Sequence, residues 1–443
     1  MKDWILMFTV VVVVIGTSLA MIRWLAPSLL GVPTDLQLVQ VDEKVPPFYE
    51  NIFRIEDHRG DSLLLQDPLT RIRPRPLLLR DAYLGPHDIL GFRNPSVPNV
   101  ADVVTIGDSM TYGNNARMEN NWPGVMADAL VAGRATVYNM GAGGWGAVQY
   151  LDMFSNATLL RPRVIVVAFY TGNDPLDSFM MAYSGRRWSA LVPDTGLDSS
   201  DAPPVEFPAP QSEWWPVTFS DGVKTVFTPE LRLASNQKHP AVDAGYEIMA
   251  RVMETMVDMS RELPLRLVAT IIPTKELVYA NRVAKEGIEA PAAYRQLVER
   301  EAANIRHLGD RIAGNQGLEY VDVLEPLQTA ADSSLLLYPD DVNGHPADAG
   351  YAVIGKTIAR TVDGLLPPRL RGRVAYREGD TYKILLVSDD GYRYFSSLEI
   401  MQQNGWPEGE VQPVTRRDLA GIPYRGVIST VNPARFGPQH SDT

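Results

Sequence analysis

The chain has 443 residues, a formal net charge of −12 and no cysteine. This length is enough to bury a large core and to form more than one domain. The negative charge argues against a nucleic-acid-binding surface, and it would repel an acidic polymer wherever no local basic patch exists. The lack of cysteine excludes disulfides, thiolate zinc sites and a cysteine nucleophile.

The chain starts with an apolar run from Trp4 to Ile22, which lies between Lys2 and Arg23. A run of this length just spans the hydrocarbon core of a bilayer. It is long for the apolar part of a signal peptide, and no clean Ala-x-Ala cleavage site follows it. We therefore predict a transmembrane signal anchor over residues 1–24, with a cleaved signal peptide and a buried core helix as the alternatives.

Residues 25–99 are broken by prolines and form a lead-in segment to the first predicted domain. Near its end, Arg93 is interpreted as a surface residue that closes a turn, and contact with a functional site is the alternative.

A buried strand runs into a polar turn at residues 103–109. The sequence Val-Val-Thr-Ile changes there to Gly107-Asp108-Ser109. In an open α/β sheet, ligands bind outside the carboxyl ends of the strands. Ser109 therefore stands where a nucleophile is expected, and Asp108 is expected to brace the turn. The triplet alone is weak evidence, because composition produces it by chance in about one chain of this length in ten.

Strand and helix patterns alternate after residue 100, which predicts a parallel sheet with right-handed crossovers. Further strands are predicted just before residue 139 and at 164–170, 265–272 and 318–323, and helices at 123–133, 146–160, 244–262, 294–313 and 349–365. The methionines of the 244–262 helix recur at helical spacing, which indicates core packing.

Residues 180–240 form an insertion rich in Pro, Ser and Asp that carries Trp188, Trp214 and Trp215. A loop of this length is either functional or disordered. In one interpretation the insertion is a lid whose tryptophans stack on a sugar ring. In the other, which we favour, the tryptophans pack together as a small satellite core. The insertion is too polar to be expected to line an acyl-chain tunnel.

A second, smaller unit follows Pro367-Pro368. Residues 382–387 and 392–395 read as a β-hairpin with a glycine-containing turn. We predict a small β module over residues 370–430 and a flexible tail over 431–443.

Four polar blocks follow the predicted strands in order. They are Gly107-Asp108-Ser109, Asn139 with Gly144 five residues later, Asn173-Asp174, and the segment from Asp340 to His345. This set resembles the SGNH (GDSL-type) hydrolase superfamily over residues 100–366, and the anchor suggests a membrane-anchored member. The resemblance implies an α/β fold with a three-layer, flavodoxin-like parallel sheet.

On the family pattern, Ser109 is the nucleophile and His345 is the base. The backbone amides of Ser109 and Gly144 and the side chain of Asn173 would form the oxyanion hole. A base is needed because a serine hydroxyl is a poor nucleophile until its proton is removed. Of the six histidines, only His345 sits in the loop after the last predicted strand of the sheet, at the edge that also presents Ser109.

The residue that orients His345 is less clear from the sequence. The family places an aspartate two or three residues before the histidine, and this chain has Asn343 and Val342 there. We predict Asp341 as the third catalytic residue, because a carboxylate stabilises the imidazolium and an amide does not. Asp340 and Asn343 remain the alternatives.

These residues predict a serine ester hydrolase that forms an acyl-enzyme on acyl esters, most simply acetyl esters of a carbohydrate. A polysaccharide O-acetyltransferase is the first alternative, and a non-catalytic carbohydrate-binding protein is the second. The prediction includes no cofactor and no metal. The expected partners are an acylated small molecule or polysaccharide and the membrane, through residues 4–22. The resemblance places the catalytic domain on the extracytoplasmic side of a single-pass protein.

Overall fold

The computed structural model describes residues 63–429, apart from gaps at 68–69, 79–84, 99, 131–134, 367–371, 379–380, 389–390, 404–411, 415–418 and 420–423. The predicted anchor at 1–24, most of the lead-in segment and the tail at 431–443 therefore lie outside the described residues. Among the helices that the structure describes, none combines the length and the apolar character that a bilayer crossing requires.

Five parallel strands form the central sheet. They are β3 (Val103–Gly107), β4 (Val137–Gly141), β5 (Val164–Tyr170), β8 (Arg266–Ile272) and β9 (Leu318–Asp322). Their order across the sheet is β4-β3-β5-β8-β9. This order places the topological switch point, where ligands bind in doubly wound sheets, between β3 and β5. The predicted α/β fold with a three-layer, flavodoxin-like parallel sheet is confirmed.

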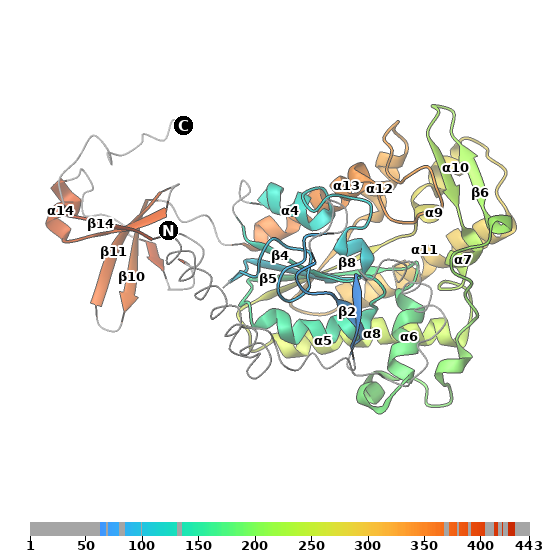
Figure 1. Cartoon of the computed structure of the whole chain (residues 1–443), viewed down its shortest axis with the longest axis horizontal. Coiled ribbons are helices and arrows are strands. Elements are labelled where there is room, and N and C mark those ends of the chain that lie inside the picture. The colour runs from blue at the N-terminus through green and yellow to red at the C-terminus, as the bar shows by residue number, and fades with distance from the viewer. Residues whose placement is uncertain are drawn as a thin grey trace, which may run out of the picture.

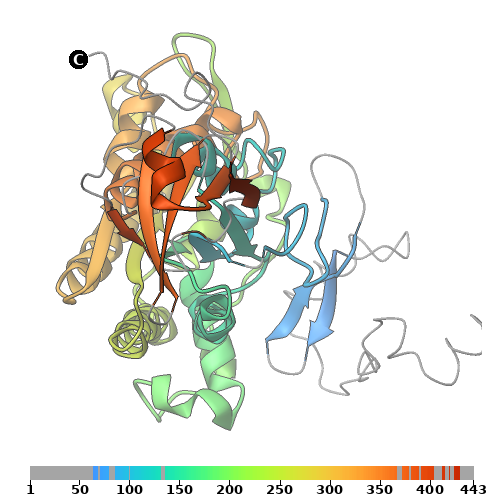
Figure 2. The ribbon, with the colours of Figure 1, turned by 90° about the vertical axis from the view of Figure 1, so that its left-hand side faces the viewer.

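Helices cover both faces of this sheet and make the three layers (Figures 1 and 2). One face carries α5 (Ala147–Thr158), α8 (Pro240–Ser260) and α11 (Ala292–Ala313), and the other carries α4 (Trp122–Ala129), α12 (Leu324–Ala331) and α13 (Asp348–Leu365). The elements predicted from hydrophobic periodicity begin and end within a few residues of these bounds.

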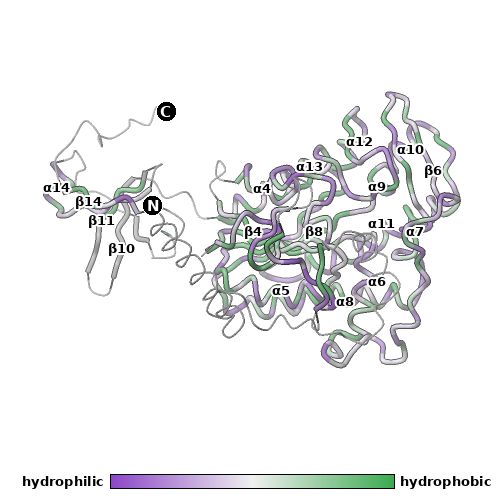
Figure 3. Tube along the Cα trace, in the orientation of Figure 1, coloured by the Kyte–Doolittle hydropathy of each residue, from purple (hydrophilic) through white to green (hydrophobic). Residues whose placement is uncertain are grey.

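Residues of each strand alternate between the two cores. Val104 and Ile106 of β3 pack on the α5–α8 side, whereas Val103 packs on the α4–α13 side. Successive side chains of a strand point to opposite faces, so a sheet covered on both sides needs apolar residues throughout. The hydrophobic stretches along the strands in Figure 3 reflect this requirement. On α8, Met249 and Met253 are fully buried, as the methionine spacing predicted.

The insertion at 180–240 is ordered by its own small elements. It begins on α6 (Asp174–Tyr183) and continues through the 3₁₀ turns η3 (Arg186–Leu191), η4 (Ser199–Asp201) and η5 (Gln211–Glu213), the hairpin β6 (Trp215–Thr218) and β7 (Lys224–Phe227), and α7 (Pro229–Leu233). Trp215 packs against Phe227 and Tyr294, with ring centroids 5.3 Å and 4.6 Å away. The satellite-core interpretation agrees with this packing for Trp215, whereas Trp214 is exposed.

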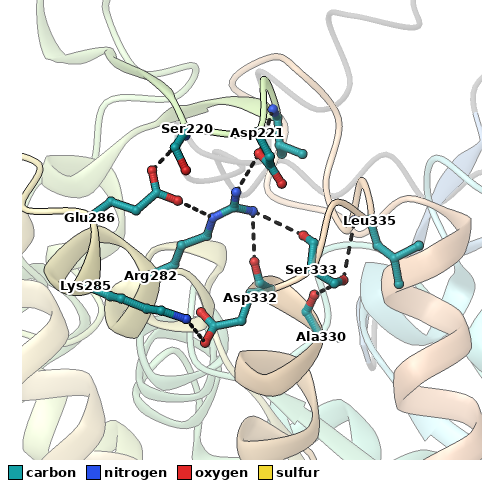
Figure 4. A network of polar contacts seen from close by, with 11 residues as sticks. Ser220, Asp221, Arg282, Lys285, Glu286, Ala330, Asp332, Ser333 and Leu335 are labelled. Atoms are coloured by element: carbon teal, nitrogen blue, oxygen red, sulfur yellow. Dashed lines mark hydrogen bonds and ion pairs between the residues drawn. The ribbon is translucent and has the colours of Figure 1, made fainter.

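A buried arginine attaches the β6–β7 hairpin to the rest of the domain (Figure 4). Arg282 of α10 (Ala280–Lys285) contacts Asp221 at 2.5 Å and Glu286 at 2.9 Å, and its side chain is only 4% exposed. Glu286 also accepts the backbone N–H of Ser220 at 2.7 Å, and Arg282 donates to the carbonyl of Ala331 at 2.9 Å. These contacts fix the insertion in place by charge-assisted hydrogen bonds.

Two further small units flank the central domain in sequence. Before it, β1 (Leu64–Asp67) pairs with β2 (Arg71–Pro74) in an antiparallel hairpin. After it comes a five-stranded sheet made of β10 (Gly372–Glu378), β11 (Thr381–Ser388), β12 (Gly391–Phe395), β13 (Gln412–Val414) and β14 (Tyr424–Ile428), together with α14 (Leu398–Gln403). The antiparallel pairing of β11 with β12 is the hairpin predicted there.

Candidate active site

Ser109 begins the short helix α3 (Ser109–Tyr112) directly after β3. Asp108 is fully buried and caps this helix, because its Oδ1 accepts the N–H of Met110 at 2.8 Å. The other carboxylate oxygen lies 3.3 Å from Oγ of Ser109. Asp108 thus braces the turn, as its place in the sequence predicted, and the turn presents Ser109 at the carboxyl edge of the sheet.

The backbone after α3 is held by a residue whose role the sequence did not indicate. Arg93 is 1% exposed, and its guanidinium donates to the carbonyls of Gly113 at 2.7 Å and Ala116 at 2.9 Å. The prediction that Arg93 lies at the surface is wrong. The last carbonyls of a helix lack intrahelical partners, and one planar guanidinium can supply several donors to them.

His345 lies between α12 and α13, and its Nε2 is 2.7 Å from Oγ of Ser109. Its Nδ1 is 2.7 Å from Oδ1 of Asn343. That oxygen also accepts the backbone N–H of His345 at 3.1 Å, and Nδ2 of Asn343 donates to Asn115 at 2.8 Å. The Asn343 amide is therefore oriented as an acceptor toward the ring. A proton on Nδ1 satisfies that acceptor and leaves a lone pair on Nε2 for the serine proton.

The prediction that Asp341 orients His345 is corrected by this geometry, since Asn343 occupies the position at Nδ1. Asp341 is exposed, and its Oδ1 accepts the backbone N–H of Asn343 at 2.7 Å. Nζ of Lys275 donates to the backbone carbonyls of Asp341 at 2.8 Å and Asn343 at 3.0 Å. Lys275 thus holds the loop through these two backbone carbonyls. The Asp341 side chain lies on the exposed side of the loop, where it accepts the N–H of Asn343.

The electrostatic surroundings keep His345 uncharged. Burial, followed by the positive charges of Arg232 and Lys275, lowers the pKa of His345 to about 3. Its imidazole is therefore available as a base at neutral pH. Burial also lowers the pKa of Lys275 to about 8. Lys275 was not predicted, because a lysine after a strand carries no motif that marks it.

Gly144 and Asn173, the predicted oxyanion donors, line the same cavity as Ser109. Asn173 stands at the N-cap position of α6, but its side chain makes no capping hydrogen bond. Instead, Nδ2 of Asn173 donates to Oδ2 of Asp177 at 2.6 Å. The structure thus brings both residues beside the serine, and their role in binding an oxyanion stays a prediction.

Three carboxyl groups are buried around these residues, and the sequence analysis gave a role to Asp108 alone. Burial raises the pKa of Asp108 to about 7 and that of Asp177 to about 8. The pKa of Asp174 is raised well above its usual value, first by burial and then by the charge of Asp108. Oδ2 of Asp174 accepts the hydroxyl of Tyr150 at 2.9 Å. Burial outweighs the hydrogen bonds that these carboxyl groups accept, so it favours partly protonated carboxyl groups at neutral pH.

A cavity of about 540 Å³ opens beside Ser109 and His345. Most of its walls are apolar, and the insertion supplies one of them. The lining residues include Leu63, Leu64, Leu176, Met180, Ala202, Pro203, Pro204, Val205, Phe207 and Leu231, with the polar His87, Tyr170 and Arg232. Trp188, Trp214 and Trp215 do not line it. Within the polar insertion, the segment from Ala202 to Phe207 thus supplies apolar residues to the cavity wall, and whether this wall holds an acyl chain stays a prediction.

Within the part of the chain that the structure describes, no group of three or more His, Asp or Glu side chains is arranged to hold a metal ion.

The chain is similar to solved structures of this architecture. A protein of the lipolytic G-D-S-L family from Desulfitobacterium hafniense shares 16% identity, with a TM-score of 0.32, over 60% of this chain and 98% of its own. An acetylxylan esterase from Geobacillus stearothermophilus shares 12% identity, with a TM-score of 0.33, over 60% of this chain and 95% of its own. An α/β hydrolase from the metagenome of Lake Arreo shares 15% identity, with a TM-score of 0.33, over 61% of this chain and 98% of its own.

The comparison with curated proteins found no match. The GDSL-like Lipase/Acylhydrolase family, in contrast, matches residues 105–353, which contain Ser109, Gly144, Asn173 and His345. Because this match covers more than half of the chain, the chain belongs to the GDSL-like lipase/acylhydrolase family and is a hydrolase that acts on esters.

Proposed function

We propose that the protein is a serine esterase that works through an acyl-enzyme on Ser109. One observation carries this proposal. Nε2 of His345 lies 2.7 Å from Oγ of Ser109, and Nδ1, on the opposite side of the ring, lies 2.7 Å from the acceptor Oδ1 of Asn343. This is the arrangement of a nucleophile, a base and an orienting acceptor, which recurs in acyl transfer on unrelated folds.

The reaction begins when Oγ of Ser109 attacks the ester carbonyl and His345 takes the hydroxyl proton. The negative charge then develops on the carbonyl oxygen, at the wall that Gly144 and Asn173 form. Collapse of the tetrahedral intermediate breaks the bond to the alcohol, which leaves with the proton from His345. Water attacks the remaining acyl-serine, and His345 again acts first as base and then as acid.

Asn343 makes this site different from one with a carboxylate in the third position. Replacing the carboxylate of a serine protease by an amide costs about four orders of magnitude, because the histidine then adopts the wrong tautomer. Here the contacts of Asn343 to Asn115 and to the His345 N–H hold the amide oxygen toward the ring. The tautomer is therefore the productive one, although the imidazolium gains no charge partner from Asn343.

The walls of the cavity support an ester with an apolar part that fits into about 540 Å³. Residues 202–207 and Leu231 of the insertion would contact that part together with Leu176 and Met180. An acetyl ester of a carbohydrate is the substrate that the sequence predicted. The apolar walls do not add support for a sugar, and they favour an ester of an apolar alcohol or acid.

The test is hydrolysis of 4-nitrophenyl acetate by the purified full chain and by Ser109→Ala. We expect turnover by the wild type and none above background by the variant, with an unchanged unfolding midpoint because Ser109 contributes little packing. Covalent labelling by a fluorophosphonate should occur in the wild type only. A wild-type protein that neither turns over the ester nor takes up the label would be a binding protein and not an enzyme.

A further inference from the structure

The cavity contains two polar groups that the proposed reaction does not use. Arg232 of α7 and Tyr170 at the end of β5 line the cavity together with Ser109 and His345. The buried hydroxyl of Tyr170 and the buried Nε of Arg232 have no hydrogen-bond partner among the described residues. Buried donors are nearly always paired, so two unpaired donors in one cavity call for an acceptor from outside the chain.

The two groups lie close to each other and to the base. An atom placed at the Cβ position of Gly344 would lie 2.5 Å from Nη2 of Arg232 and 3.2 Å from the hydroxyl of Tyr170. Any side chain at residue 344, directly before His345, would displace the guanidinium. The centre of the guanidinium also lies 5.8 Å from the centroid of the Tyr170 ring. Arg232 and Tyr170 therefore meet at one spot beside the imidazole.

The backbone positions these groups rigidly. Asn236, which is 1% exposed, donates to the carbonyls of Arg232 at 3.1 Å and Thr171 at 3.0 Å. Its Oδ1 accepts the hydroxyl of Tyr246 at 2.7 Å. Gly172 lets the Tyr170 ring fold back, because a Cβ there would lie 2.3 Å from the ring. The backbone at Arg232 and the ring of Tyr170 are thus held in place before any ligand arrives, which lowers the entropic cost of binding.

Among the described residues, Arg232 has no direct carboxylate partner, although the charges of Glu276, Glu301 and Asp108 act on the neighbouring Tyr170. Lys275 adds a second positive charge close to His345, although its Nζ is held by backbone carbonyls. A partly enclosed cation without a direct counter-ion is stabilised when an anion completes the site.

We propose that Arg232 and the Tyr170 hydroxyl form a carboxylate-binding subsite, and that the preferred ester carries a carboxylate in addition to its apolar part. The guanidinium would bind the carboxylate by charge-assisted hydrogen bonds, and the tyrosine hydroxyl would donate a further one. This inference rests on the proposed esterase function and deepens it by naming a substrate class. Binding of the anion would also balance the positive charge that acts on His345 when the imidazolium forms.

The test compares esters that differ only in charge. One pair is 4-acetoxybenzoate and its methyl ester, with the carboxylate on the alcohol side. The other is mono-4-nitrophenyl glutarate and its methyl ester, with the carboxylate on the acyl side. The quantity measured is the ratio of kcat/KM for the charged ester to that for the neutral ester. We expect at least about a tenfold preference for the charged ester in one of the two pairs, from a hydrogen bond to a charged group.

Variants assign this preference to the two residues. Arg232→Gln should lower the ratio by about 10- to 100-fold, and Arg232→Lys should restore part of it, since a lysine keeps the charge but loses the planar fork. Tyr170→Phe, which keeps the ring, should lower the ratio by about 3- to 10-fold. Arg187→Gln is the matched control, because Arg187 carries the same charge on the same insertion, pairs with Asp152 and does not line the cavity.

Ratios near one in both pairs would overturn the subsite while the esterase function stands. If the wild type hydrolyses none of the four esters, the proposed function fails, and binding to Ser109→Ala, measured by calorimetry, decides the subsite. Tighter binding of a charged ester than of its methyl ester, lost in the Ser109→Ala, Arg232→Gln double variant, would support it. Equal binding, or no binding, of the members of each pair would overturn it. Tyr170→Phe provides the same comparison if Arg232→Gln does not fold.

Discussion

At the scale of single residues, the site depends on an amide where related chemistry most often has a carboxylate. Asn343 accepts both the ring Nδ1 and the backbone N–H of His345, and it donates to Asn115. Three hydrogen bonds therefore define the direction of one side chain. Since an amide oxygen cannot carry the charge of a carboxylate, the contribution of Asn343 is to select the tautomer and to orient the ring.

This role predicts that Asn343→Ala lowers kcat for 4-nitrophenyl acetate by about 10²- to 10⁴-fold, in the range found when the orienting residue of a triad is removed. Asp341→Asn should stay within about threefold of the wild type, because an exposed side chain that caps a loop contributes little. The measurement is steady-state turnover at pH 7.5. The assignment of Asn343 is wrong if Asp341→Asn loses its turnover and Asn343→Ala keeps it.

At the scale of elements, the site is built where β3, β5 and the segment before α13 end at one edge of the sheet. The turn from β3 into α3 presents the nucleophile, and the start of α6 presents Asn173. These turns leave backbone carbonyls without partners, and buried side chains from other segments supply the donors. Arg93 does this after α3, and Lys275 does it in the loop that carries His345.

We expect Arg93→Met to lower the free energy of unfolding by about 2–4 kcal/mol, because several buried carbonyl groups lose their donor. Arg93→Lys should recover only part of this loss, since one ammonium cannot reach all of the carbonyls that the guanidinium contacts. Urea denaturation followed by tryptophan fluorescence measures the effect. Arg187→Gln, an exposed arginine, is the control, and an equal loss in both variants would contradict the buried role of Arg93.

At the scale of the whole molecule, the buried carboxyl groups link stability to pH. The pKa of Asp108 is raised to about 7 and that of Asp177 to about 8, whereas both lie near 3.8 in an unfolded chain. Between these values the folded state holds protons that the unfolded state has lost. Stability from these groups is therefore complete below about pH 4 and is lost as the pH rises through 7 and 8. The pKa of His345 is lowered to about 3, so its contribution to stability rises with pH, but only below about pH 6.5.

The free energy of unfolding should consequently fall by about 1–3 kcal/mol between pH 6.5 and 8.5. No cysteine titrates in this window to obscure the trend. Asp177→Asn keeps the shape of the side chain without its charge, so its stability should depend less on pH. Asp341→Asn, at the surface, serves as control. Denaturation curves at both pH values give the free energies of unfolding. An equal change in this free energy between the two pH values for Asp177→Asn and the wild type would refute the role of Asp177.

The placement of the chain relative to a membrane lies outside the described residues, and we propose it from the apolar run between Trp4 and Ile22. A reporter that is active only in the cytoplasm, fused after Thr443, should be inactive, and a reporter that is active only outside the cytoplasm should be active. The reverse pattern would place the catalytic domain in the cytoplasm. Release of the protein from membranes by alkaline carbonate would indicate that the segment does not anchor it.

The sequence by itself determined the central sheet, the position of Ser109 and the choice of His345. These follow from local information: apolar runs of strand length, helical periodicity, and polar residues directly after strand ends. Parallel strands present their carboxyl ends at one edge, so residues far apart in sequence could be expected to meet there. The 2.7 Å contact between Ser109 and His345, 236 residues apart, is the result of that topology.

Only the tertiary structure decided that Asn343 and not Asp341 faces the imidazole, that Arg93 is buried, and that Arg232 reaches the cavity. Each of these depends on which way a side chain points, and contacts from distant segments determine that direction. Lys275 donates hydrogen bonds to backbone carbonyls of the loop that carries His345, and Asn236 donates one to the backbone carbonyl of Arg232. Such contacts have no period and no spacing in the sequence, because they form only after the sheet and its insertion have packed together.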